Sequence, residues 1–243
     1  MSTEVKELAE ILINGEKVPE PAWQLRVIVS EECLSYCVWN EKTHEAILID
    51  PKQEDRRAYE TLFIALRGYR WLAIVDTHTH ADHISIASVL ANEFRAPLVM
   101  HEKSPSQRVQ IKIATETHFS SQAGDIRFIP TPGHTQDAMS VIWGPYLFTG
   151  DTILFGDTGR DDLPGGSAEN HFESIQTLKL AVAPELIVLP GHDDKGGRAS
   201  SWTTQLKLNP SLSQNREDFV TASNAFNGPA PIFLKDSLRE NFR

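Results

Sequence analysis

Four strand-like apolar runs in this chain each end at a side chain that can bind a metal ion. The runs are AIVDTHTHADH, FIPTPGH, LFTGD and VLPGH, and their ligand-type residues include His78, His134, Asp151 and His192. Loops that leave strands at one edge of a sheet come close together in space and commonly carry functional residues. The pattern therefore predicts a sheet-based fold whose edge holds one metal site.

The segment HTHADH adds three further candidate ligands to His78. Alternate residues of an extended strand point the same way, so His78 and His80 can face one ion. Asp82 and His83 follow the turn, face elsewhere and suit a second ion. Imidazole and carboxylate side chains favour Zn, Fe or Mn, and no cysteine in this set draws the preference towards thiolate sites. The other histidines lack such neighbours and are predicted to be structural: His44, His101, His118 and His171.

The spacing of apolar residues predicts two groups of strands with helices between them. Such an order is typical of the α/β class, here two mixed β-sheets back to back with helices outside. At 243 residues the chain suits one domain over residues 23–243, including a short C-terminal helical tail, after an N-terminal arm over residues 1–22. Strands are expected at 23–30, 34–40, 45–50, 71–77, 97–101 and 185–191 and in IRFIPTPGH, MSVIWG and YLFTGD, and helices at 55–69, 82–94 and 171–182.

The composition disfavours several partners. A formal net charge of -10 argues against nucleic acid or an anionic membrane as the main partner, and a compact acidic chain is atypical of a nuclease. The N-terminus lacks the pattern of a secretory signal, and no apolar run reaches the roughly 18 residues of a membrane span. Cys33 and Cys37 are expected to be reduced thiols. The sequence thus predicts a soluble cytoplasmic protein and allows a homodimer.

The motifs HTHADH, PGHT, TGD and PGHD, in this order and at these separations, resemble the signature of the metallo-β-lactamase superfamily. The resemblance covers roughly residues 23 to 195. It implies an αββα sandwich (the metallo-β-lactamase fold) with the metal site at the sheet edge. Fold alone does not choose among the reactions of this superfamily. A metal-free scaffold is disfavoured, since such a relative would be expected to lose ligands.

Within the superfamily the chain resembles persulfide dioxygenases, also called sulfur dioxygenases, more than glyoxalase II. The stretch FTGDTILFGDTGRDD is similar to the dioxygenase pattern, which implies that Arg160 contacts glutathione. The tail LKLNPSLSQNREDFVTASNAFNGPAP also resembles theirs, and only 51 residues follow His192, too few for the helical domain of glyoxalase II. Two features depart from the pattern: GRDDLPGGS resembles compact glyoxalase-II-like hydrolases, and Asp194 replaces a glutathione-binding tyrosine.

The dioxygenase resemblance implies one Fe(II) per chain, held by His78, His134 and Asp151. Two histidines and one carboxylate leave three coordination positions open, enough for a persulfide sulfur and O₂. The implied reaction, a step of sulfur metabolism, oxidises a low-molecular-weight thiol persulfide similar to glutathione persulfide to sulfite and free thiol. The remaining ligand-type residues would orient these ligands or hydrogen-bond water: His80, Asp82, His83 and His192.

The hydrolase alternative implies two zinc ions in place of one iron. The zinc ions would lower the pKa of a bridging water towards about 7, for attack on a thioester such as an S-acylglutathione. All seven ligand-type residues are present, so both states stay open. The implied ligands are His78, His80 and His134 for the first ion, Asp82, His83 and His192 for the second, and Asp151 as the bridge.

Overall fold

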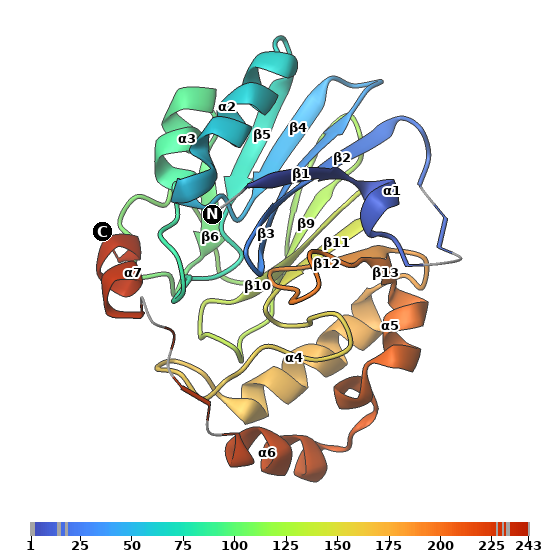
Figure 1. Ribbon diagram of the computed structural model, residues 1–243, viewed down its shortest axis with the longest axis vertical. Helices are drawn as coiled ribbons and strands as arrows, with labels where there is room; N and C mark the ends of the chain where they lie inside the picture. Colours follow the sequence, from blue (N-terminus) through green and yellow to red (C-terminus); the bar gives the residue numbers. More distant parts are fainter. Residues whose placement is uncertain are drawn as a thin grey trace.

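Two β-sheets face each other in the computed structural model, and helices cover their outer faces (Figure 1). The structure describes residues 3–13, 16–17, 19–226, 228–229, 231 and 234–242. This arrangement confirms the αββα sandwich predicted from the sequence. The first sheet contains, in spatial order, β1 (Glu4–Glu7), β2 (Trp23–Ser30), β3 (Cys33–Asn40), β4 (Glu45–Ile49), β5 (Arg70–Val75), β6 (Leu98–His101) and β7 (Ile111–Ile113).

The second sheet begins at the edge strand β13 (Ser200–Ser201) and ends at β8 (Thr117–Phe119). Its inner strands are, in spatial order, β12 (Ile187–Pro190), β11 (Tyr146–Gly150), β10 (Met139–Trp143) and β9 (Ile126–Pro130). In Figure 1 the helices α2 and α3 cover the first sheet, and α4, α5 and α6 lie on the side of the second. The helices are α1 (Leu8–Ile11), α2 (Arg56–Ala65), α3 (Ala87–Phe94), α4 (Ala168–Ala181), α5 (Trp202–Leu208), α6 (Arg216–Ala225) and α7 (Leu234–Asn241).

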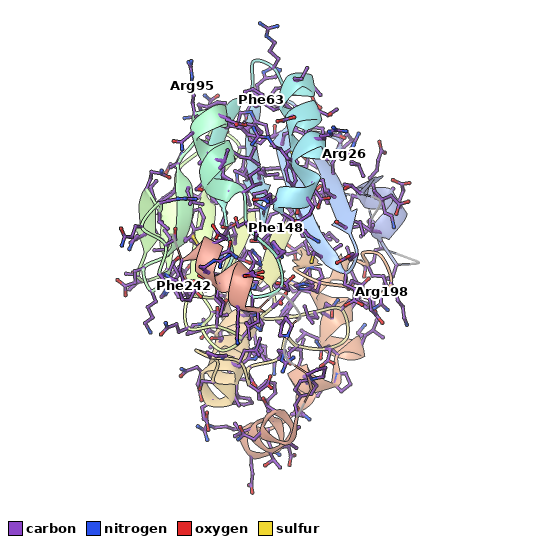
Figure 2. All side chains as sticks on the ribbon, turned by 60° about the vertical axis from the view of Figure 1, so that its left-hand side comes forward. Arg26, Phe63, Arg95, Phe148, Arg198 and Phe242 are labelled. Atoms are coloured by element: carbon purple, nitrogen blue, oxygen red, sulfur yellow. The ribbon has the colours of Figure 1, made fainter. Side chains whose placement is uncertain are left out.

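Strand β3 is buried on both faces, which accounts for its nearly continuous apolar sequence. Tyr36 and Val38 belong to the buried cluster between the sheets, together with Phe148 of β11. Cys37 and Trp39 point the opposite way, into the cluster under α2 and α3. Successive side chains of a strand alternate between faces, and here both faces are buried. Figure 2 places Phe148 in the interior of the molecule.

The arm predicted for residues 1–22 joins the first sheet in its described part. β1 pairs antiparallel with β2, with Glu4 opposite Val29 and Glu7 opposite Arg26. Leu8 and Ile11 are buried in the cluster between the sheets. Within the described part of the chain, no helix combines the length and apolar character that a bilayer crossing requires.

The helix predicted over residues 82–94 is wrong at its start, because α3 begins only at Ala87. The main chain before it is held by other partners: the amide of Gln53 donates to the carbonyl of Ile84, and the amide of Ile86 donates to that of Pro51. The hydroxyl of Ser85 accepts from the amide of Ala87. These contacts keep the preceding loop out of the helix and in an irregular, bent conformation.

Candidate metal centre

The structure brings the four strand ends together at one edge of the sandwich. His78 follows β5, His134 follows β9, and Asp151 follows β11 directly. Ligand atoms of these three residues, called the triad below, lie within 4.8 Å of one another, and all three side chains are buried. His192, after β12, places its Nδ1 2.8 Å from Oδ1 of Asp151.

Hydrogen bonds on the outer side of two triad imidazoles leave their inner nitrogens free. Thr77 Oγ1 donates to Asp50 Oδ2 (2.8 Å), so it accepts from the Nδ1–H of His78 at 3.0 Å. His134 donates through Nδ1 to the carbonyl oxygen of Arg160 at 2.5 Å. With Nδ1 protonated, each ring keeps a lone pair on Nε2, the form in which imidazole binds a metal.

His80 and His83 carry buried ring nitrogens that lack a partner. Nε2 of His80 lies 3.3 Å from Oδ1 of Asp50, whereas its Nδ1 is buried and has no hydrogen-bond partner among the described residues. The same holds for Nε2 of His83. An unsatisfied buried nitrogen costs about 1–3 kcal/mol. A bound cation would remove that cost, so the buried donor set fits a metal ion.

The charge states within the triad also suit metal binding. Burial lowers the pKa of His78 well below its ordinary value and lowers that of His134, which keeps both imidazoles neutral. Burial alone would raise the pKa of Asp151, but the attraction of His192 and its hydrogen bond outweigh burial and hold this carboxyl below its ordinary range. The triad therefore offers two neutral imidazoles and one carboxylate.

A second cluster of ligand-type side chains lies beside the triad and consists of Cys33, Asp82, His83 and His192. Oδ2 of Asp82 lies 2.9 Å from Nδ1 of His83, 3.1 Å from Nε2 of His192 and 3.1 Å from Sγ of Cys33. The sequence predicts no cysteine among the candidate ligands, whereas the structure places Cys33 beside Asp82 and His83. Cys33 lies 49 positions before Asp82, and no spacing motif links the two.

Two glycines of the motifs allow the main chain to approach the ligands closely. A Cβ on Gly191 would lie 2.4 Å from Oδ1 of Asp151, and one on Gly150 would lie 2.4 Å from Oγ1 of Thr77. Gly150 also adopts a φ of 49°, a region that favours glycine. The amide of Gly191 donates to the carbonyl of Gly150 at 2.8 Å, which holds the PGH and TGD loops together.

Helix α7 closes the loop that carries the histidine motif. Nδ2 of Asn241 donates to the carbonyl oxygens of His80 and His83, both at 2.9 Å. Its Oδ1 accepts from the amide of Ser85, also at 2.9 Å. Nothing in the sequence pattern links residue 241 with the motif, so Asn241 escapes prediction from the sequence.

Arg160, the predicted substrate-binding residue, is engaged by other groups in this structure. Its guanidinium donates to both carboxylate oxygens of Asp162 (2.7 and 2.8 Å) and to the carbonyl oxygens of Pro229 (2.6 Å) and Gly228 (3.2 Å). It also lies over the ring of Phe226, 5.1 Å from the centroid. The side chain therefore joins the loop after β11 to the segment that leads into α7.

A cavity of about 180 Å³ lies beside His134, and α7 forms one of its walls. Figure 2 shows Phe242 at the end of α7. None of the described lining residues is a lysine or an arginine, and Arg160 lines a different cavity. Asp137 contributes a carboxylate that already accepts from the amide and hydroxyl of Thr79. The apolar part of the wall consists of Ala81, Pro105, Leu163, Pro164, Leu234, Leu238 and Phe242.

The chain is similar in sequence to a known protein family and to several known proteins. The model of the metallo-beta-lactamase superfamily matches residues 110–192. The chain is 29% identical to persulfide dioxygenase ETHE1, mitochondrial, of Homo sapiens, over 86% of this chain and 83% of that protein. It is 31% identical to the probable polyketide biosynthesis zinc-dependent hydrolase BaeB of Bacillus velezensis, over 79% of this chain and 87% of that protein.

A solved structure is similar to this chain over most of the length of both. The crystal structure of ETHE1 from Myxococcus xanthus superposes with a TM-score of 0.81 at 27% identity, covering 90% of this chain and 97% of that one. The relatives named above are enzymes, and both kinds, dioxygenase and zinc-dependent hydrolase, match most of their own length. On its fold, its motifs and these relatives, the chain belongs to the metallo-β-lactamase superfamily.

Proposed function

We propose that this protein oxidises a low-molecular-weight thiol persulfide with O₂, at one Fe(II) held by His78, His134 and Asp151. The observation that carries this proposal is the buried triad of two neutral imidazoles and one carboxylate. Two histidines and one carboxylate with open positions are typical of non-heme Fe(II) oxygenases. The similarity to proteins named persulfide dioxygenase, over most of both chains, supports it.

The reaction consumes one persulfide, one O₂ and one water and yields one thiol and one sulfurous acid, which ionises to sulfite. The terminal sulfur loses four electrons and O₂ gains four, the S–S bond breaks, and water supplies the third oxygen of sulfite. Fe(II) would supply the redox step that couples the persulfide to O₂. The residues of the chain hold the ligand atoms: Thr77 orients His78, the carbonyl of Arg160 orients His134, and His192 orients Asp151.

The cavity beside His134 suits the thiol part of the substrate. It borders the triad, and its described wall is largely apolar and holds no cationic side chain. Glutathione carries carboxylates, and Arg160 would have to leave Asp162 to bind one of them. Asp194, at the position of the expected tyrosine, accepts from Arg198 at 3.2 Å. We infer that an uncharged, apolar thiol persulfide binds better than glutathione persulfide, with Arg160 as the candidate contact for any anionic group.

A dinuclear zinc hydrolase of thioesters is the second candidate. The second cluster favours it, because Asp82, His83 and His192 lie together at the triad. The similarity to a zinc-dependent hydrolase also supports it. Zinc ions would activate water for attack on the thioester carbonyl. In this case His78, His80 and His134 would hold the first ion, Asp82, His83 and His192 would hold the second, and Asp151 would contribute to both.

Metal analysis and O₂ uptake on the same preparation separate the two candidates. Protein produced without added zinc is expected to contain about one iron per chain, the stoichiometry of a single facial triad, and to consume O₂ with glutathione persulfide or an alkyl persulfide. His134→Ala is expected to lose iron and O₂ uptake, whereas His118→Ala, at an exposed histidine, retains both. Two zinc ions per chain, no O₂ uptake and hydrolysis of S-lactoylglutathione would establish the hydrolase instead.

Three further properties stay predictions from the sequence. The net charge of -10 leads us to propose no nucleic-acid or membrane partner. We also propose that the protein is cytoplasmic and forms a homodimer. Size-exclusion chromatography with light scattering tests the homodimer directly.

A further inference from the structure

We propose that Cys33 is a fourth ligand in the second cluster, so that Cys33, Asp82, His83 and His192 form a site selective for zinc over iron. The sequence motifs do not include this cysteine. The inference concerns the second cluster alone and does not depend on which reaction the triad catalyses. The ligands of the triad and of this site have no residue in common.

The donors of the second cluster converge on a single carboxylate oxygen. Oδ2 of Asp82 is the hydrogen-bond acceptor within 3.1 Å of Cys33 Sγ, His83 Nδ1 and His192 Nε2. A carboxylate oxygen has about two lone pairs, so three donors exceed what it can accept well. A cation at the centre of this group would replace the three protons and bind all four side chains. Metal sites of this kind release protons when the metal binds.

His83 presents one buried ring nitrogen to the second cluster. The residue is 6% exposed, and its Nδ1 lies 2.9 Å from Oδ2 of Asp82. Cys33, Asp82 and His83 also offer ligand atoms that lie within 4.8 Å of one another. Sγ of Cys33 lies 3.5 Å from Nε2 of His192, so the thiol contacts the ligand on the other side as well.

The main chain holds Cys33 in place at this site. The amide of Leu34 donates to the carbonyl of Gly191, and the amide of Asp193 donates to the carbonyl of Glu32, both at 2.9 Å. These two bonds pair Cys33 with His192 as opposite residues of a β-bridge. The turn between β2 and β3 is therefore fixed to the loop after β12. A thiol held in this way needs little reorganisation to bind an ion shared with His192.

The added thiolate determines which metal the site prefers. A thiolate is a softer ligand than imidazole or carboxylate and favours zinc, while the triad without sulfur suits Fe(II). Four protein ligands that include cysteine are also typical of closed zinc sites. The second position would then bind zinc while the triad binds iron.

Cobalt substitution tests the role of Cys33 by a readout other than activity. The metal-free wild-type protein, loaded with Co(II), is expected to show the near-ultraviolet absorption of a cobalt thiolate. Cys33→Ser is expected to lose this absorption and to bind zinc at the second position about 100-fold more weakly. Cys37→Ser is the matched control, because Cys37 is fully buried under α2 and α3, away from the cluster. It is expected to keep the absorption.

Two outcomes would overturn the proposal. One is a wild-type protein that binds two Co(II) ions per chain without the thiolate absorption, and the other is an absorption that persists in Cys33→Ser. If Cys33→Ser fails to fold, the cobalt absorption and the thiol labelling of the wild-type protein test the proposal. Zinc is expected to protect the partly exposed Cys33 from iodoacetamide, as read by mass spectrometry, and equal labelling with and without zinc contradicts a ligand role. O₂ uptake is not measured in either test, so failure of the proposed reaction leaves their outcome unchanged.

Discussion

The side-chain amide of Asn241 donates a 2.9 Å hydrogen bond to the main-chain carbonyl of His83, a residue 158 positions earlier in the chain. The same amide donates to the carbonyl of His80 and accepts from the amide of Ser85. One side chain of α7 thus satisfies three main-chain groups of the loop that carries the histidine motif. The conformation of this loop depends on the docking of α7.

Replacing Asn241 with Asp should loosen the histidine loop. Asp retains the acceptor for Ser85 but cannot donate to the two carbonyls, and its charge repels them. At about 1 kcal/mol for each lost hydrogen bond, we expect a loss of about 2 kcal/mol in the free energy of unfolding, measured with urea. Asn92→Asp, where the exposed amide donates to Ser88 on α3, is the control. Equal stability and equal metal content of the two variants would contradict a role for α7 at the site.

Asp50 should be required for metal affinity although it need not contact the metal. It accepts from the amide and hydroxyl of Thr77 and lies 3.3 Å from Nε2 of His80. In Asp50→Asn, the new NH₂ group would face either the amide or the hydroxyl of Thr77, and both of these are hydrogen-bond donors. The substitution would also weaken the contact that fixes the tautomer of His80. We expect about 10–100-fold weaker metal binding, measured by competition with a chelator. Asp55→Asn, at a buried carboxylate that accepts from Thr3, should leave the affinity unchanged.

Gly191→Ala should disturb the carboxylate of the triad directly. The new Cβ would lie 2.4 Å from Oδ1 of Asp151 and 3.1 Å from the carbonyl carbon of Gly150, so the carboxylate or the loop must move. We expect metal content per chain to fall below half. Gly124→Ala is the control: its φ of 107° makes alanine strained there, but no atom lies within 4 Å of the new Cβ. Normal metal content in Gly191→Ala would show that the loop can absorb the methyl group.

Arg160 and Asp162 should affect substrate binding in opposite directions if the guanidinium binds an anionic substrate group. Arg160→Ala would remove the charge and raise KM for glutathione persulfide about tenfold, the effect of one charge-assisted hydrogen bond. Asp162→Asn would release the guanidinium from its present partner and lower KM. KM is read from O₂ uptake at constant iron content. If both variants have the same KM as the wild type, Arg160 does not bind the substrate. Its role is then structural, through its contacts with Gly228 and Pro229.

Local sequence patterns were sufficient for the longer strands and for the convergence of the ligand-type residues, but they did not predict the short strands β1, β7, β8 and β13. Apolar runs that end at His78, His134, Asp151 and His192 predict strand ends, and strand ends of a sandwich meet at its edge. The prediction of a helix before Ala87 is wrong, because tertiary hydrogen bonds compete with helix formation there. The amide of Gln53 donates to the carbonyl of Ile84, and the amide of Ile86 donates to that of Pro51. Propensity describes a segment alone and cannot include such partners.

The sequence by itself determined which side chains are available to a metal and that strands deliver them to one edge, because both follow from residue type and a period of two along a strand. Only the tertiary structure decided that Cys33 joins Asp82, that Asp50 lies behind His80, and that Asn241 closes the loop. These contacts connect residues 30 or more positions apart. Their distances depend on how sheets and helices pack, and no local spacing along the chain encodes that packing.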